Sequence, residues 1–177
     1  INSWSDLRAR LEPEDRRCFA FFHPLIPNEP LIFVEVALTD KMPKTINEVI
    51  KIDRSITRDK DINTAVFYSI SSCQDGLSGI SFGNFLIKAV AHKLKQKNEG
   101  LEKFVTLSPA PDFTKWLKEK SIDEDLDEDS LLKQSLIYLL HTDREDEFPN
   151  DSVARFHLGN GASLERVNLN SDLSSKG

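Results

Sequence analysis

The sequence predicts a single domain in which helices are layered against a sheet, of the α/β or α+β class. Two observations carry this prediction: an initial pair of strand-like runs, and later strand-like runs that are each followed by a helical pattern. A third is size, because 177 residues with 39% hydrophobic and 29% charged side chains can bury one sizeable core. No internal repeat interrupts this order.

The first expected elements are a short helix and a strand pair. "SWSDLRARL" has Ser3 as a possible N-cap and spaces three apolar residues along one helical face, namely Trp4, Leu7 and Leu11. The runs 16–24 and 29–39 are rich in β-favouring residues and are joined by a link that contains Pro and Asn. This pattern suits an antiparallel pair, with Glu35 as an interruption of the second strand.

A short helix, a strand and a long helix are expected next. Residues 45–52 form a short amphipathic pattern, and residues 63–72 are rich in Val, Ile and aromatic side chains. The long helix is expected from residue 82 to about residue 98, with Gly100 closing the segment. Its apolar residues recur at helical spacing and are Phe85, Leu86, Ala89, Val90 and Leu94.

The last third of the chain holds a strand that ends at a serine and three further segments. "FVTLSPAPDF" indicates a buried strand, and Pro109 biases Ser108 towards an extended conformation. Asp112 is a plausible N-cap for a helix in "DFTKWLKEK". Residues 130–140 form another helical pattern, and residues 151–169 run through a helical turn and a Gly-Asn-Gly break to a last extended segment.

The segment "SSCQDGLSGISFGNFLIK" (71–88) is the part of the chain most suited to contact a ligand. A strand, a glycine-rich turn and a helix N-terminus together let backbone N–H groups approach a phosphate, whose negative charge the helix dipole favours. The spacing of Gly76, Gly79 and Gly83 matches neither the G-x-x-x-x-G-K-[ST] nor the G-x-G-x-x-G motif. A glycine-rich turn that serves only packing is the alternative.

Charge and composition argue against several classes of function. The net charge of −6 disfavours general nucleic-acid binding, which needs a basic face. The lysines of residues 88–97 indicate a solvated helix face, or else a landing surface for an anionic ligand. Cys18 and Cys73 lack C-x-x-C spacing and the four histidines form no ligand pair, so we expect no zinc and a reducing compartment. No apolar stretch approaches the ~20 residues that a membrane-spanning helix requires.

Ser108 and His157 carry reactive side chains in settings that leave two interpretations open. A serine at a strand end before proline is usually a turn residue, and no G-x-S-x-G pattern indicates a hydrolase here. His157 lies in "ARFHLGNG", where Gly159 and Gly161 can end a helix, and the helix dipole favours the protonated form of a histidine in a last turn. A purely structural role is the alternative for both residues.

Four blocks of the sequence, in the same order, resemble a known family. They are "RRCFAFFHPLIPNEPLIFVEVALT", "AVFYSISSCQDGLSGISFGNFLIKAV", "FVTLSPAPDFTKWL" and "DSVARFHLGNGASLERVN", and together they cover more than half of the chain. In these blocks the chain resembles the catalytic domain of malonyl-CoA decarboxylase. The resemblance implies an α+β fold similar to that of the GCN5-related acetyltransferases, with a mixed, splayed central sheet that is flanked by helices and admits the CoA arm.

The same resemblance implies an activity and a site. The activity would be that of a carboxy-lyase of fatty-acid metabolism, which converts malonyl-CoA to acetyl-CoA and CO2 without a cofactor or a metal. Ser108 and His157 would be the catalytic serine and histidine, with malonyl-CoA as the partner and a homo-oligomer as the full-length assembly. Neither nucleic acid nor a membrane is an expected partner. The residues expected to bind the substrate are Gly76, Gly79, Ser81, Gly83 and Asn84.

The chain also departs from the family pattern. Ser81 stands where some members carry a glutamate, so an acid or base role at that position does not transfer. A tyrosine that the family has further downstream finds no counterpart before Gly177, and the helical domain that usually comes first is absent. We therefore expect residues 1–177 to be one partial, acyl-CoA-binding catalytic domain, in the cytoplasm or alternatively the mitochondrial matrix. The functional alternatives are a CoA-dependent acyltransferase and a non-catalytic acyl-CoA sensor.

Overall fold

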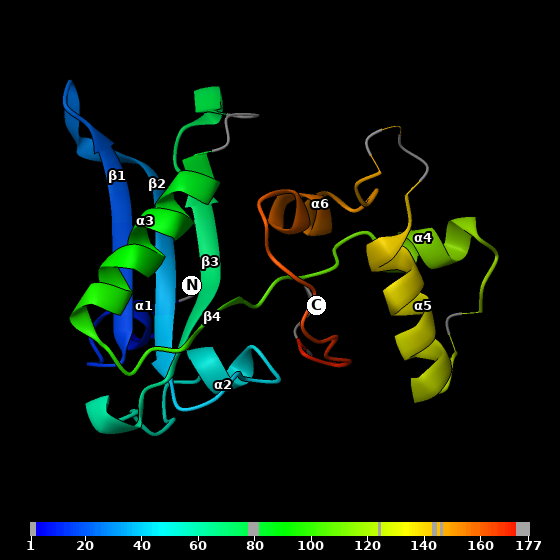
Figure 1. The fold of residues 1–177 in the computed structure, drawn as a ribbon, viewed down its shortest axis with the longest axis horizontal. Coiled ribbons are helices and arrows are strands. Elements are labelled where there is room, and N and C mark those ends of the chain that lie inside the picture. Colours follow the sequence, from blue (N-terminus) through cyan, green and yellow to red (C-terminus); the bar gives the residue numbers. More distant parts are fainter. Residues whose placement is uncertain (1–2, 78–81, 124, 143–144, 146, 173–177) are drawn as a thin grey trace. The chain divides into compact units, whose positions relative to one another are not determined.

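The computed structural model describes residues 3–77, 82–123, 125–142, 145 and 147–172 (Figure 1). The chain divides into two compact units, Ile1–Leu107 and Ser108–Gly177. In the described residues, the first unit holds one sheet with helices on both faces, and the second unit holds helices only. The single domain expected over residues 1–177 stays a prediction, because a division by compactness does not test where a catalytic function lies.

The sheet of the first unit is mixed. β1, β2 and β3 pair antiparallel, whereas β3 and β4 pair parallel after a crossover that contains a helix. The α+β class with a mixed sheet is therefore confirmed, and so is the antiparallel pair formed by the first two strands. The strands lie in sequence order across the sheet and are β1 (Arg16–His23), β2 (Ile26–Thr39), β3 (Thr64–Ser72) and β4 (Lys103–Thr106).

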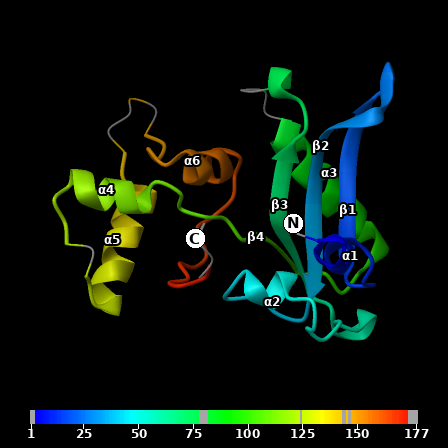
Figure 2. The same cartoon turned by 180° about the vertical axis from the view of Figure 1, so that it is seen from behind.

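Helices cover both faces of this sheet. α3 (Phe82–Lys97) lies on the face seen in Figure 1, and α1 (Trp4–Leu11) and α2 (Asn47–Ile50) lie on the face seen in Figure 2. Because successive side chains of a strand point to opposite faces, β2 and β3 contribute to a core on each side. The core beneath α3 contains Ile32, Val34, Val36, Leu38, Ala65, Phe67, Leu86, Val90 and Leu94. The smaller core beneath α2 contains Ala37, Val49 and Val66.

β3 contains a β-bulge in its pairing with β2 and pairs with β4 along only part of its length. Tyr68 is an extra residue of β3 opposite the step from Glu35 to Val36, which makes a β-bulge. β4 pairs with β3 only as far as Phe67, and β3 runs on beyond that point to Ser72 (Figure 1). No described residue pairs as a strand with the stretch from Tyr68 to Ser72 on the β4 side. This arrangement agrees with the splayed sheet that the resemblance implied.

The second unit is built from short helices with a small apolar core. They are α4 (Phe113–Glu119), α5 (Glu128–Leu140) and α6 (Ser152–Gly159). α5 begins after Asp127, whose carboxylate accepts a hydrogen bond from the Ser130 N–H at 2.8 Å. Among the residues described in this unit, the buried hydrophobic side chains are those of Leu117 and Tyr138. Specific polar contacts therefore have a large part in positioning these helices.

Several local expectations from the sequence are wrong. α1 has its N-cap at Ser3 as expected, but none of its residues is buried and Trp4 is 78% exposed, so its apolar stripe does not join the core. β4 is an edge strand of exposed and half-buried residues, not a buried strand. Glu35 does not interrupt β2, because it lies buried inside the strand. Asp112 precedes α4, yet its side chain makes no capping hydrogen bond.

Candidate active site

Ser108 and His157 contact each other within the second unit. The Ser108 Oγ lies 3.0 Å from the His157 Nε2, although 49 residues separate the two in sequence. The serine is exposed and the histidine is half-buried. The hydroxyl can donate to this nitrogen or accept from it, depending on which ring nitrogen carries the hydrogen. The fold thus brings together the two residues that the resemblance marked as a pair, and their catalytic role stays a prediction.

α6 holds His157 in its last turn, and both ends of this helix are capped. At its start the buried Asp151 is the N-cap, and its Oδ1 accepts a hydrogen bond from the Ala154 N–H at 2.6 Å. At its end Gly161 has φ +89°, and the Ala162 N–H donates to the His157 carbonyl at 3.0 Å. This is a Schellman turn, which favours glycine because its φ is positive. The glycine stop expected from the sequence is confirmed at Gly161.

The surroundings of His157 favour its neutral form. Burial lowers the pKa of His157 below its ordinary value of 6.5, because partial removal from water disfavours the charged imidazolium. The sequence predicted the opposite direction from the dipole of α6, and that expectation is wrong, since burial lowers the pKa of His157. The ring of Phe156 adds apolar surface, with its centroid 5.0 Å from that of the imidazole.

Tyr138 of α5 links the cap of α6 to α4, and sequence reasoning missed it. Its hydroxyl donates a hydrogen bond to the Asp151 Oδ2 at 2.6 Å, and both side chains are buried. Its ring lies with its centroid 5.4 Å from that of Phe113 and 5.6 Å from that of Trp116, both of α4. The only sequence signal was an aromatic residue in the helical pattern of residues 130–140, which does not reveal a partner 13 residues away.

The residues expected to bind CoA lie in the first unit. Gly76 is part of a single 3₁₀ turn, Asp75–Leu77, and a Cβ built on it would meet no atom within 4 Å. Gly83, which is buried, and Asn84 lie in the first turn of α3. Gly79 and Ser81 lie outside the described residues. The strand, turn and helix expected around this segment are present as β3, the 3₁₀ turn and α3.

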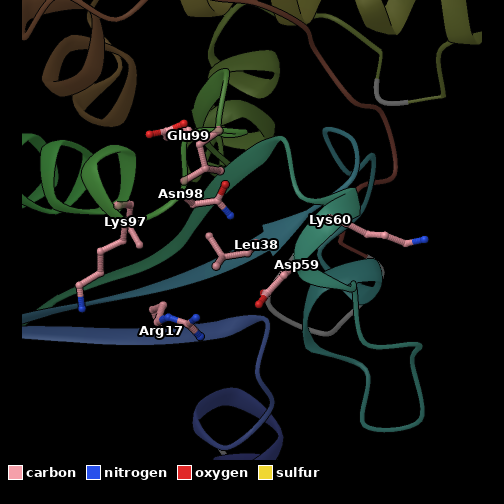
Figure 3. A pocket seen from close by; sticks show the side chains of 9 residues that line it. Arg17, Leu38, Asp59, Lys60, Lys97, Asn98 and Glu99 are labelled. Carbon is pink, nitrogen blue, oxygen red and sulfur yellow. The ribbon is translucent and has the colours of Figure 1, made fainter.

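The first unit also holds a cavity that the sequence did not suggest. Its volume is about 430 Å³, its buried apolar residues are leucines, and charged side chains surround them (Figure 3). None of the expected site residues lines it. The lining residues are Arg17, Leu38, Asp59, Lys60, Leu94, Lys97, Asn98, Glu99 and Leu101.

Searches for a metal centre and for a membrane span found neither in the part of the chain that the structure describes. No group of three or more His, Cys, Asp or Glu side chains there could hold a metal ion. No described helix combines the length and the apolar composition needed to cross a bilayer. Cys18 and Cys73 are both exposed, free thiols.

Comparisons with known proteins agree with one another. The family model described as the malonyl-CoA decarboxylase C-terminal domain matches residues 1–131 and 119–177. Mitochondrial malonyl-CoA decarboxylase of Anser anser anser is 35% identical over 224 aligned positions, which cover 100% of this chain and 44% of the relative. The protein of the same name from Rattus norvegicus is 33% identical and is covered to 45%. The chain therefore spans somewhat less than half the length of these relatives.

Two solved structures share the fold of the whole chain. The malonyl-CoA decarboxylase of Agrobacterium vitis superposes with a TM-score of 0.89 at 44% identity, over 99% of this chain and 50% of that one. The enzyme of Rhodopseudomonas palustris gives a TM-score of 0.83 at 45% identity, over 98% of this chain and 46% of that one. With a family model that matches along the whole chain, the chain belongs to the malonyl-CoA decarboxylase family, in the part described as its C-terminal domain.

Proposed function

We propose that this chain is the catalytic part of a malonyl-CoA decarboxylase, which converts malonyl-CoA to acetyl-CoA and CO2. The observation that carries the proposal is the 3.0 Å contact between Ser108 and His157, the two residues that the family resemblance marked before their positions were known. The family membership of the chain supports the same conclusion.

The chemistry of this reaction suits a hydroxyl–imidazole pair. The bond between the carboxylate carbon and the methylene carbon breaks, CO2 leaves, and the electron pair forms an enolate whose negative charge lies on the thioester oxygen. The methylene carbon then takes up one proton, which the Ser108–His157 pair delivers and regains from solvent. A neutral imidazole suits the first step, since an imidazolium would hold the malonyl carboxylate by ion pairing and oppose its loss as neutral CO2.

The CoA part of the substrate is assigned to the first unit. Backbone N–H groups at the start of α3, including those of Gly83 and Asn84, would face the phosphates, together with the turn that contains Gly76. The backbone of β3 from Tyr68 to Ser72, which lacks a strand partner on the β4 side among the described residues, would supply hydrogen bonds to the pantetheine arm. The reaction needs no cofactor. The full-length protein would form a homo-oligomer and would be located in the cytoplasm or in the mitochondrial matrix.

Turnover of malonyl-CoA by variants of the full-length protein tests the proposal. Ser108→Ala and His157→Ala should each lower kcat for CO2 release by about 10²–10⁴-fold, the range that a general acid–base group contributes. Ser152→Ala and His141→Gln are matched controls, because Ser152 is an exposed serine of α6 and His141 is the histidine that follows α5. They should keep wild-type rates, and all variants should keep the wild-type circular dichroism spectrum.

Two results would overturn the proposal. Full CO2 release by both Ser108→Ala and His157→Ala would remove these residues from the reaction. Release of free CoA that depends on an added amine, or binding of malonyl-CoA without its consumption, would instead indicate an acyltransferase or a sensor. Acetyl-CoA and CO2, formed in equal amounts without an acceptor, are the expected products.

A further inference from the structure

Tyr138 is in contact with both segments that hold the Ser108–His157 pair. Its hydroxyl donates to the carboxylate of Asp151, the N-cap of the helix that carries His157. Its ring packs against Phe113 and Trp116 of α4, which begins shortly after Ser108.

The hydroxyl of Tyr138 is held as a donor. Burial, and after it the hydrogen bond to Asp151, raises the pKa of Tyr138, so that the phenol keeps its hydrogen throughout the neutral range. Asp151 uses its two oxygens differently: Oδ1 accepts from the Ala154 N–H and caps α6, while Oδ2 accepts from Tyr138. The hydrogen bond between Tyr138 and Asp151, called the tie below, can therefore be removed while Asp151 still caps α6.

The second unit has only a small apolar core that could help to fix the distance between Ser108 and His157. Among its described residues, Leu117 and Tyr138 are the buried hydrophobic ones, so no broad apolar core locks α4, α5 and α6 together. Within α6 itself, Arg155 donates to the carbonyls of Pro149 and Asn150, which ties the helix only to the segment just before it. The contacts of Tyr138 join the cap of α6 to α4 through a single side chain.

We propose that Tyr138 is a positioning residue, which sets the Ser108–His157 distance by holding the cap of α6 against α4. It acts through Asp151 and touches neither the serine nor the histidine in any contact described above. This inference rests on the proposed function, in which the pair must keep a reactive geometry. A displacement of a reacting group by about 1 Å can lower the rate by about 10²-fold, so a contact that fixes this placement is important for catalysis.

Two single variants and their combination test the tie in the full-length protein. Tyr138→Phe removes only the hydroxyl and keeps the ring contacts, whereas Asp151→Ser keeps one oxygen as an N-cap for the Ala154 N–H and has no second polar atom for Tyr138. Ser135→Ala is the matched control: Ser135 is also a buried hydroxyl of α5, and it donates only to the Leu131 carbonyl of its own helix, at 2.8 Å.

The expected result is a loss of kcat at nearly constant KM. Tyr138→Phe and Asp151→Ser should each lower kcat for malonyl-CoA by about 10- to 100-fold, and the double variant should lose no more than the worse single variant, because both remove the same hydrogen bond. Ser135→Ala should stay within about 2-fold of the wild type. Wild-type kcat in Tyr138→Phe, or additive losses in the double variant, would overturn the proposal.

A readout that does not depend on turnover separates this inference from the proposed function. The imidazole of His157 can be titrated by NMR, with His157→Ala identifying its signal. If the hydrogen bond between Tyr138 and Asp151 holds α6 in place, Tyr138→Phe should hydrate the imidazole and move its pKa up towards 6.5, while Ser135→Ala leaves it unchanged. An unchanged His157 titration in folded Tyr138→Phe would refute the tie. Failure of the wild type to release CO2 while this shift occurs would refute the proposed function instead.

Discussion

Asp15 is the residue whose replacement should most clearly weaken the first unit. Its carboxylate is fully buried and accepts two hydrogen bonds from Arg54, from Nη1 at 2.7 Å and from Nη2 at 2.9 Å. The Thr57 N–H donates to it at 2.9 Å, and Arg16, which is also buried, lies 3.2 Å away. One side chain therefore joins the start of β1 to the loop that follows α2. Asp15→Asn keeps the shape of this residue and removes its charge.

The expected loss follows from what the substitution leaves behind. Burial lowers the pKa of Arg16 to about 10 even though Asp15 opposes this effect, so the guanidinium stays charged and loses its neighbouring carboxylate. Removal of one partner from a buried ion pair typically costs about 3–5 kcal/mol, because it leaves an uncompensated charge. We expect the free energy of unfolding to fall by about that amount, a large part of the ~5–15 kcal/mol that stabilises an ordinary protein.

Urea unfolding followed by circular dichroism measures this loss. Asp61→Asn is the matched control, because Asp61 pairs with Arg58 at a similar 2.9 Å but with side chains that are 41% and 73% exposed. Its effect should stay within about 1 kcal/mol, as for other exposed pairs. A loss below about 1 kcal/mol in Asp15→Asn would refute the reasoning.

The effect of Asp15→Asn should also depend on pH. Burial alone would raise the pKa of Asp15, but hydrogen bonds from Arg54 and Thr57 and the charges of Arg16 and Arg54 lower it overall, below the ordinary 3.8. A carboxyl whose folded pKa is depressed stabilises the fold above its unfolded pKa, and this stabilisation is lost as the pH falls through the folded pKa. The difference between wild type and Asp15→Asn should therefore be full at pH 7 and shrink below pH 4.

Two further predictions concern α6. Since burial lowers the pKa of His157 and the proposed reaction uses its neutral form, kcat/KM should fall on the acid side with a midpoint below pH 6.5; a midpoint above pH 6.5 would contradict this assignment. Gly161→Ala should cost about 1–2 kcal/mol in urea unfolding, because alanine is strained at φ +89°. Gly159→Ala, a helical position whose Cβ would lie 3.7 Å from the Phe148 ring, should be neutral or stabilising, so equal losses in both variants would argue against backbone strain as the cause.

Much of the local structure could be predicted from sequence because its causes are local. Strand composition marked β1, β2 and β3, and apolar spacing marked α3 within one residue of its observed end at Lys97. The glycine stop of α6 could be predicted for the same reason, because it depends only on the positive φ angle of Gly161. The pattern misjudged Trp4 and Glu35, because exposure depends on what packs against a residue and not on the residue itself.

For the candidate site, too, the sequence predicted some features and only the tertiary structure showed the others. Taken alone, the sequence determined which elements form and, through resemblance to a family, which serine and which histidine to consider. Only the tertiary structure decided that Ser108 Oγ and His157 Nε2 lie 3.0 Å apart, that burial lowers the pKa of His157, and that Tyr138 reaches Asp151. Propensity and periodicity act over a few neighbouring residues, whereas a hydrogen bond across 49 residues and the loss of water around an imidazole arise only when distant segments pack together.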